Sequence, residues 1–361
     1  MKVANQLKVP LFKEGLNALK VYPGYKLGQV WSRPVSVNFL ITSRCNSKCI
    51  TCDSWKLTDH DRELTLDDFK RLAAEIAELD IPIVTIGGGE PTLRSDLWEI
   101  IRAFKEQGRV VQLTTNALTM KAEQRKQVYD SGLDRVTISV DSHLPRLYHL
   151  IRGVDGGQKV LENLQALLRE RPPTLEVDSN TVLCKDNAES FLETLDYLIS
   201  IGVPKVNFSA VTTAGNNYLM VEPKKDLADI PSTLIDRIIV GLLERKKTSD
   251  TIPASTTFIK GLRTYYANPT KVVFPCFAGH LTLDIFQDGS VHGCGNLPAF
   301  SNVREASLRE IWCGDAASQN RTDMAEGRCT NCYLSCKIEL AIAANPRHLP
   351  SFALEKLAGS F

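Results

Sequence analysis

The sequence has almost no net charge, no long apolar run and no signal-peptide pattern. Its 361 residues carry a formal charge of +1, which gives no electrostatic reason to expect nucleic acid or an acidic membrane surface as a partner. No apolar run approaches the roughly eighteen residues that a membrane-spanning helix needs. Because no secretory signal precedes the cysteines, we expect a cytoplasmic protein in a reducing compartment.

Cysteine is abundant but unevenly placed. Of the ten cysteines, three lie at positions 45–52, six lie between Cys276 and Cys336, and Cys184 lies alone. Clustered cysteines in a reducing compartment indicate metal or redox use rather than disulfides. The apolar share of 43% and the charged share of 24% are ordinary for a soluble enzyme. At this length, we expect one large domain and one small domain.

The first cysteine group has the spacing C-x3-C-x2-C and directly follows the apolar run Val35–Ile41. Cys45, Cys49 and Cys52 are too close in sequence to pair sensibly as disulfides. Their thiolates suit a metal or an iron–sulfur cluster, and three ligands would leave one iron of a four-iron cluster open. A structural zinc site is the alternative. It needs four protein ligands, and His60 is the one close candidate.

Strands and helices alternate along residues 35–210. Each connection is long enough for a crossover helix, so the pattern predicts a parallel sheet, either a barrel or an open doubly wound sheet. The expected strands are Ser36–Thr42, Ile81–Ile86, Val110–Thr115, Arg135–Val140, Leu175–Leu183 and Val206–Ala210.

Polar and glycine-rich motifs follow several of these strands. Gly87-Gly88-Gly89-Glu90-Pro91 follows the second strand, and consecutive glycines let the backbone come close to a ligand. The third, fourth and fifth strands lead to Asn116, to Ser139 and Asp141, and to Asn180, while Arg152 lies farther along the chain. In a barrel, functional residues gather at these carboxyl ends. A turn at the glycines, a helix cap at Asp141 and a solvated Arg152 are the structural alternatives.

Together, the C-x3-C-x2-C loop after the first strand and the Gly-Gly-Glu-Pro motif one unit later resemble the radical S-adenosylmethionine (radical SAM) enzymes. The resemblance implies a partial (β/α)6 barrel, related to the TIM barrel, with a [4Fe-4S] cluster on Cys45, Cys49 and Cys52. In that family, the open iron binds SAM, and one electron cleaves SAM to a 5′-deoxyadenosyl radical that abstracts a substrate hydrogen. A one-electron reductant such as flavodoxin or ferredoxin is the implied partner.

The resemblance also assigns SAM-binding residues. Its cofactor-binding positions correspond to Gly88, Gly89, Glu90, Ser139, Asp141 and Arg152, and Asn116 and Asn180, at the ends of the third and fifth strands, are further candidates. The sequence departs from the family before the third cysteine, where an aromatic residue commonly shelters the adenine. Thr51 occupies that position here, and Trp55 is a possible replacement.

The second cysteine group resembles the C-terminal SPASM or shortened twitch domain of radical SAM enzymes, which holds auxiliary iron–sulfur clusters. Leu283–Val291 predicts a hairpin with an Asp-Gly turn between two of the cysteines. Because two fully ligated four-iron clusters need eight cysteines, we expect one auxiliary [4Fe-4S] cluster and favour the twitch form. Its expected ligands are Cys276, Cys294, Cys329 and Cys332, with Cys336 competing for one place and zinc as the alternative metal.

We therefore expect a radical SAM oxidoreductase or epimerase with five segments. These are an N-terminal helix and linker at 1–34, the partial barrel at 35–210, bridging helices at 211–275, the auxiliary-cluster domain at 276–345 and a tail at 346–361. Residues 1–34 are too few for the leader-binding domain of many peptide maturases. This favours oxidation (dehydrogenation) or epimerisation of a small polar metabolite, such as a sugar or aminocyclitol, over a peptide, protein side chain or lipid.

An epimerase needs a cysteine that returns a hydrogen atom to the substrate. Cys184, Cys313 and Cys336 are the catalytic candidates for that role, although Cys184 also fits an ordinary buried thiol. Two non-enzymatic interpretations remain, an iron–sulfur electron carrier and a zinc-stabilised scaffold. The Gly-Gly-Glu-Pro and Ser-Val-Asp motifs would have no task in the electron carrier.

Overall fold

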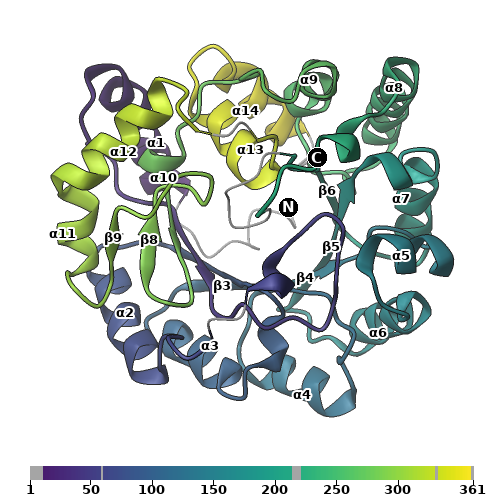
Figure 1. Ribbon diagram of the computed structural model, residues 1–361, viewed down its shortest axis with the longest axis horizontal. Helices are drawn as coiled ribbons and strands as arrows, with labels where there is room; N and C mark the ends of the chain where they lie inside the picture. The colour runs from purple at the N-terminus through teal and green to yellow at the C-terminus, as the bar shows by residue number, and fades with distance from the viewer. Residues whose placement is uncertain (1–10, 58–59, 214–220, 330–331, 359–361) are drawn as a thin grey trace.

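A parallel β-sheet wrapped by helices forms the centre of the molecule (Figure 1). The computed structural model describes residues 11–57, 60–213, 221–329 and 332–358. Within these ranges, the nine strands of the sheet follow the order β6-β5-β4-β3-β2-β1-β7-β8-β9. The first six strands in sequence are all parallel neighbours: β1 (Ser36–Leu40), β2 (Ile83–Gly87), β3 (Val110–Thr115), β4 (Arg135–Ser139), β5 (Glu176–Leu183) and β6 (Val206–Ala210).

Crossover helices cover the outer face of these strands, as a parallel sheet requires. Figure 1 shows them as an arc around the strands. They are α2 (Leu66–Glu78), α3 (Leu97–Glu106), α4 (Ala122–Asp130), α5 (Pro145–Arg152), α6 (Gly157–Glu170) and α7 (Phe191–Ser200). Thr65 caps the start of α2 with a capping box, in which its side chain accepts from the Asp68 N–H and the Asp68 carboxylate accepts from the Thr65 N–H. The expected (β/α)6 partial barrel is confirmed.

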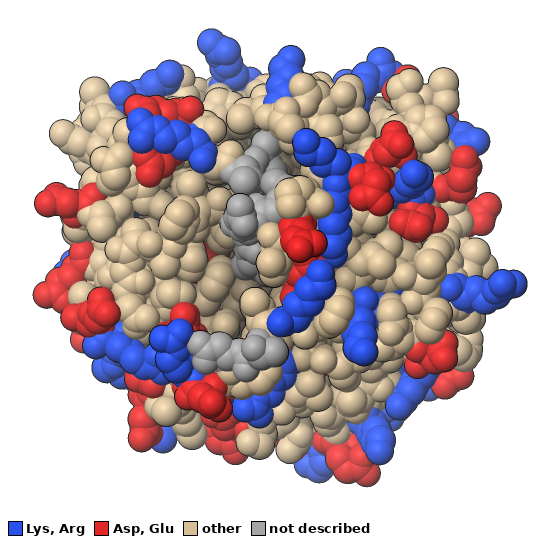
Figure 2. Space-filling model, in the orientation of Figure 1, with Lys and Arg blue, Asp and Glu red and all other residues tan. Residues whose placement is uncertain are grey.

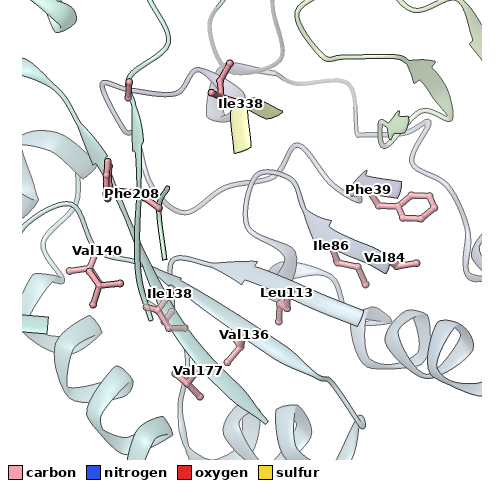
Figure 3. Packing of buried hydrophobic residues seen from close by; sticks show 14 of the residues in the cluster. Phe39, Val84, Ile86, Leu113, Val136, Ile138, Val140, Val177, Phe208 and Ile338 are labelled. Carbon is pink, nitrogen blue, oxygen red and sulfur yellow. The ribbon is translucent and has the colours of Figure 1, made fainter. Parts of the chain in front are cut away.

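Alternate residues of the strands form the apolar core. Val84 and Ile86 of β2, and Val136 and Ile138 of β4, are fully buried, while the intervening residues are half-buried (Figure 3). This is the period of two expected for a strand whose two faces differ. A closed eight-stranded barrel fills its interior with bulky apolar side chains. Here, polar side chains occupy interior positions, which leaves room for a cavity.

The sheet does not end with the sixth strand. β7 (Thr282–Ile285) pairs in parallel with β1, and the antiparallel strands β8 (Ser290–His292) and β9 (Ser301–Asn302) extend it. The hairpin predicted around Asp288-Gly289 is confirmed, and Gly289 has the positive φ of 84° that such a turn needs. The C-terminal hairpin therefore continues the barrel sheet.

The remaining helices lie on the open side of the barrel and around the hairpin (Figure 1). α13 bridges the opening, because Ser335 contacts Ser209 of β6 (2.8 Å between hydroxyl oxygens) while Lys337 contacts Asp284 of β7. No helix of the described part is long and apolar enough to cross a membrane. The helices are α1 (Leu11–Leu27), α8 (Ser232–Thr248), α9 (Thr256–Ala267), α10 (Ala278–Leu281), α11 (Leu308–Cys313), α12 (Asp315–Ala325), α13 (Ser335–Ala344) and α14 (Leu349–Ala358).

Candidate functional site

A cavity of about 190 Å³ lies at the carboxyl ends of the barrel strands. Its lining brings together the first cysteine group, the glycine motif, several strand ends and one residue of the C-terminal region. On the face shown in Figure 2, described cationic and anionic side chains are interspersed. The lining residues are Cys45, Ser47, Cys49, Thr51, Cys52, Ser54, Trp55, Gly87, Gly88, Gly89, Glu90, Thr114, Thr115, Asn116, Ser139, Arg152, Asn180, Val182, Ala210, Thr212 and Leu334.

Backbone hydrogen bonds hold the loop of the first cysteine group in place. The N–H groups of Lys48 and Ile50 donate to the carbonyls at the end of α5, each at 2.9 Å. The N–H groups of Ser47 and Ser54 each point at a sulfur, Cys45 Sγ and Cys52 Sγ, at 3.5 Å. Such donors stabilise negative charge on sulfur and are among the protein's means of tuning an iron–sulfur cluster.

The environment of these sulfurs suits a cationic centre. Burial raises the pKa of the Cys45 thiol to about 12. Burial also raises the pKa of Cys49, while the nearby Arg152 guanidinium acts in the opposite direction. A metal must displace the thiol protons in order to bind. A trio of thiols of which one is buried and two are half-buried therefore favours a group whose positive charge compensates the charge of three thiolates.

The glycine motif packs against the loop that carries the cysteines. The N–H of Gly89 donates to the Thr42 carbonyl and the N–H of Glu90 to the Arg44 carbonyl, both at 2.7 Å. A Cβ on Gly88 would lie 2.5 Å from the Thr42 oxygen, and one on Gly89 would lie 2.2 Å from the Arg44 oxygen. Gly88 also has a φ of 136°. The glycines are therefore required for contact between the two loops, in addition to bordering the cavity.

Glu90 is buried at the centre of a hydrogen-bond network. Its carboxylate accepts from the Thr92 hydroxyl (2.6 Å), the Thr92 N–H (3.2 Å), the Thr115 hydroxyl (2.6 Å) and the Asn116 N–H (2.8 Å). Burial raises its pKa, and these donors oppose that effect. The Asn116 side chain donates in turn to Asn46 Oδ1 at 2.7 Å. Glu90 and Asn116 thus connect the glycine motif, the end of β3 and the cysteine loop.

The candidate residues at the end of β4 and beyond it separate into two groups. Ser139 lines the cavity together with Asn180 of β5. Asp141 is fully buried, and the cavity lining does not include it. Its carboxylate accepts from the Val182 N–H at 2.8 Å and lies 2.6 Å from Arg152 Nε. Arg152 is buried rather than solvated, and its Nη1 lies 3.9 Å from Cys49 Sγ.

The lining includes Ser47, Thr212 and Leu334, which sequence reasoning did not identify, and Trp55, which it considered as a contact for the adenine. Within the described residues, Trp55 Nε1 and Thr212 Oγ1 are buried without a hydrogen-bond partner. Thr212 follows β6, so the strand-end rule used for the other strands could have identified it. Ser47 and Leu334 carry no comparable sequence signal.

An ion pair ties the connection after β6 to the cysteine loop. Asp53 is buried and lies 2.7 Å from Lys224 Nζ and 3.1 Å from Lys56 Nζ. Lys224 Nζ also donates to the Ile50 carbonyl at 2.9 Å. Burial opposes ionisation of Asp53, but the bonds from Lys224 and Lys56 hold its pKa below the ordinary value. The loop is therefore fixed from a second direction.

The second cysteine group also gathers in space. Cys294 packs in one cluster with Cys276 and Cys329. Burial raises the pKa of Cys332 to about 12, and the charges of Cys276, Cys336 and Cys329 add to that shift. The four expected ligands are thus neighbours, and Cys336 is adjacent to them.

The three candidate hydrogen donors lie away from the cavity lining. Cys184 is fully buried, whereas Cys313, at the end of α11, and Cys336 are exposed. Cys184 matches the ordinary buried thiol weighed from sequence. The cysteines of the lining are Cys45, Cys49 and Cys52.

The donor sets fit iron–sulfur clusters better than single zinc ions. Among the described residues, no three His, Cys, Asp or Glu side chains are placed to hold a single metal ion. A tetrahedral zinc site needs sulfurs at about 2.3 Å from one centre, which is a tighter arrangement than a four-iron cluster requires. His60 is instead engaged with Ser43, with 2.8 Å between Nδ1 and Oγ.

Two family models match the sequence. The model of the radical SAM superfamily matches residues 39–198, and that of the SPASM iron–sulfur cluster-binding domain matches residues 276–333. Three curated relatives are similar over most of the chain. A probable GTP 3′,8-cyclase of Sulfolobus acidocaldarius is 28% identical over 255 residues, 70% of this chain and 79% of the relative. An AdoMet-dependent heme synthase of Methanosarcina barkeri is 26% identical over 320 residues (83% and 88%), and a PqqA peptide cyclase of Ruegeria pomeroyi is 26% identical over 333 residues (87% and 85%).

Solved structures share the fold. SuiB of Streptococcus suis bound to S-adenosylmethionine superposes with a TM-score of 0.65 at 18% identity, covering 86% of this chain and 73% of SuiB. anSMEcpe with bound AdoMet gives a TM-score of 0.61 at 12% identity, covering 90% and 99%. The family implies a [4Fe-4S] cluster with SAM, together with auxiliary iron–sulfur binding in the SPASM region. The chain is a radical SAM enzyme, a member of that superfamily with a C-terminal SPASM iron–sulfur domain.

Proposed function

We propose that this enzyme binds SAM at a [4Fe-4S] cluster held by Cys45, Cys49 and Cys52, and that it removes a hydrogen atom from a peptide or protein side chain. The observation that carries the proposal is that one cavity is lined by these three cysteines, the glycine motif and Leu334 of the SPASM region. When bound there, the cluster and SAM supply a 5′-deoxyadenosyl radical. The chain's own residues bind, orient and shield these groups.

In this proposal, different lining residues bind different parts of SAM. The edge of Gly88, Gly89 and Glu90 receives the amino group, and Asn116, Ser139 and Asn180 bind other polar groups. Trp55, with its unpartnered Nε1 among the described residues, takes the place of the aromatic residue that Thr51 replaces and contacts the adenine.

Arg152 and Asp141 have more specific roles than sequence reasoning assigned them. Because Asp141 lies against Arg152 Nε, it orients the guanidinium toward Cys49. Arg152 remains a candidate for the SAM carboxylate, since a guanidinium can bind a carboxylate through its other nitrogens. Asp141 acts through Arg152 and does not itself contact SAM.

We further propose one auxiliary [4Fe-4S] cluster, held by Cys276, Cys294, Cys329 and Cys332. Their clustering supports this assignment, and so does the exposure of Cys313, which lies apart at the end of α11. Cys336 is the nearest additional sulfur. When bound, an auxiliary cluster would accept one electron from the substrate radical that hydrogen abstraction leaves. Loss of that electron and of one proton to solvent would make the net reaction a two-electron oxidation of the substrate.

The proposed substrate class rests on similarity to one relative and on which cysteines line the cavity. The PqqA peptide cyclase, similar over 333 residues, supports a peptide over the sugar or aminocyclitol expected from sequence. No candidate hydrogen-donor cysteine lines the cavity, which favours oxidation or bond formation over epimerisation.

The experiment begins with anaerobic reconstitution and iron counting. Reconstituted enzyme, given SAM and a low-potential reductant, is expected to form 5′-deoxyadenosine, measured by liquid chromatography and mass spectrometry. Replacing Cys45, Cys49 and Cys52 with Ala is expected to abolish that product. Cys313→Ala is the matched control and keeps it. Product formation by the triple variant would contradict the cysteine assignment.

A second experiment addresses the substrate. Candidate peptides encoded near the gene are incubated with the enzyme and compared with sugars and aminocyclitols. We expect a peptide to stimulate 5′-deoxyadenosine formation and to lose hydrogen mass at one side chain. Stimulation by the small metabolites alone would contradict the peptide proposal and leave SAM cleavage intact.

A further inference from the structure

A buried ion pair lies beside the second cysteine group. Lys337 Nζ is 2.8 Å from Asp284 Oδ1, 3.1 Å from Oδ2 and 2.9 Å from Thr282 Oγ1. The exposed fractions of the two charged side chains are 3% and 5%. Removing both charges from water is costly, and a neutral apolar pair often serves stability equally well. Stability alone therefore gives no reason for a charged pair at this position.

Asp284 holds the ammonium in place through a satisfied network. Its Oδ1 also accepts from Asn38 of β1 at 2.6 Å, and its Oδ2 accepts from the Gly295 N–H at 3.0 Å. The aspartate thus joins β1, β7, the hairpin and α13. A charge held this way cannot rotate toward solvent, so its position relative to the neighbouring cysteines is fixed.

Both partners are adjacent to cysteines. Lys337 directly follows Cys336, and Gly295, bonded to Asp284, directly follows Cys294. The positive charge of Lys337 favours negative charge on Cys276, Cys294 and Cys336, and the negative charge of Asp284 acts on the same sulfurs in the opposite direction. In a low-dielectric interior such a charge is screened little, and its effect on a nearby charge is much larger than in water.

The same segment reaches the SAM cavity. Leu334 lines the cavity, Ser335 contacts Ser209 of β6, and Lys337 contacts β7, all within one turn of the start of α13. The ion pair therefore lies where the SPASM region meets the barrel.

We propose that Lys337 is a positioning residue that sets the reduction potential of the auxiliary group, and that Asp284 holds its charge at that place. This inference rests on the proposed function, in which the second cysteine group ligates an iron–sulfur cluster. Reduction adds one electron and thus one negative charge to the group, while the reductant loses that electron. A fixed cation nearby favours the added charge and raises the potential, because local charge and hydrogen bonds are levers on cluster potentials.

The test is a redox titration of the auxiliary cluster with low-potential dyes, followed by electron paramagnetic resonance. Replacing Cys45, Cys49 and Cys52 with Ala in every variant leaves the auxiliary cluster as the one observed. Lys337→Met is expected to lower the potential and Asp284→Asn to raise it. The double variant is expected to return toward the parent value, and Lys260→Met, an exposed control on α9, to leave it unchanged.

Opposite shifts of the reduction potential in the two single variants indicate an electrostatic effect. A merely structural role would move the potential of both single variants in the same direction. Shifts of the same sign, or none, overturn the inference. If Lys337→Met loses its iron, the double variant decides the question. Iron retained by the double variant supports the pairing of the two charges, and iron lost from both variants overturns the inference. Absence of any iron–sulfur signal in the parent overturns the proposed auxiliary cluster, and this inference with it, and leaves the proposal for the first cluster to its own test.

Discussion

Gly89 lies where the loop of the glycine motif meets the loop of the first cysteine group. Its N–H bonds to the Thr42 carbonyl, and its α-carbon faces the carbonyl of Arg44. Neighbouring Gly87 has an open environment, since a Cβ there would be 4.0 Å from the nearest atom, the Phe39 oxygen. Two glycines of one motif thus have different structural roles, and only one of them is constrained by backbone contact.

Gly89→Ala is expected to displace the cysteine loop, because the added Cβ would meet backbone that cannot rotate away. We expect loss of most iron from the first cluster and destabilisation of roughly 1–3 kcal/mol, the cost of overpacking. The measurements are iron content after reconstitution and urea unfolding of the apo-protein. Gly87→Ala is the matched control for unfolding. Equal effects of the two substitutions would contradict the contact argument.

Asp178 of β5 predicts a pH dependence of stability. Burial raises its pKa from the ordinary 3.8 to about 6, although Arg135 partly offsets the effect. The folded state then binds the proton more tightly than the unfolded state. The contribution of this proton to the free energy of unfolding is complete below about pH 4 and is lost as the pH rises through 6.

Asp178→Asn is therefore expected to stabilise the apo-protein at pH 7.5 by on the order of 2 kcal/mol, with little change near pH 4. Urea unfolding at the two pH values measures the difference. Asp130→Asn, an exposed position on α4, is the control and is expected to have little effect at either pH. A stability difference that did not depend on pH would show that burial of the Asp178 charge is not the cause.

At the scale of elements, the site depends on contacts between the loops that connect the strands and helices. The cysteine loop bonds to the end of α5 through its backbone, and Lys224 from the connection after β6 fixes it from another side. These contacts join segments far apart in sequence. The loop conformation is thus a property of its surroundings as well as of its own residues.

Lys224→Met is expected to loosen the loop, because buried Asp53 would keep only Lys56 and a backbone donor. We expect a cost of roughly 1–3 kcal/mol in unfolding free energy and lower iron retention at the first cluster. Lys225→Met, the exposed neighbour, is the control. Iron content that matched the control would show that Lys224 does not hold the loop.

At the scale of the whole molecule, the barrel and the SPASM region share one sheet and one core. Leu283 and Ile285 of β7 are fully buried in the same apolar cluster as Val37 of β1. The boundary expected at residue 276 therefore divides a sheet rather than separating two independent units. The tail at 346–361 is less central, although Glu355 of α14 lies 2.7 Å from Lys246.

A fragment ending at residue 275 is expected to aggregate, because removing β7 leaves the edge of β1 and its apolar face uncovered. A fragment ending at residue 345 is expected to stay monodisperse and to lose only the helix content of α14. Size-exclusion chromatography and circular dichroism compare the two fragments with the full chain. A folded, monomeric 1–275 fragment would contradict the shared-core argument.

The sequence by itself determined the repeating architecture and predicted the kind of site. Strand–helix alternation predicts six parallel strands, and the spacing of Cys45, Cys49 and Cys52 predicts a three-thiolate site, because hydrophobic periodicity and ligand spacing are local properties. Local patterns also placed Gly88, Gly89, Glu90, Asn116, Ser139 and Asn180 at the strand ends, where the cavity lies, and the family resemblance added Arg152, which also lines it.

Only the tertiary structure decided which of these groups face one another. It turned Asp141 toward Arg152 instead of the cavity, brought Leu334 and Thr212 into the lining, and paired β7 with β1. Such contacts join residues that are distant in sequence. They depend on the direction of each side chain and on the closure of the sheet, and neither leaves a periodic signal in the chain.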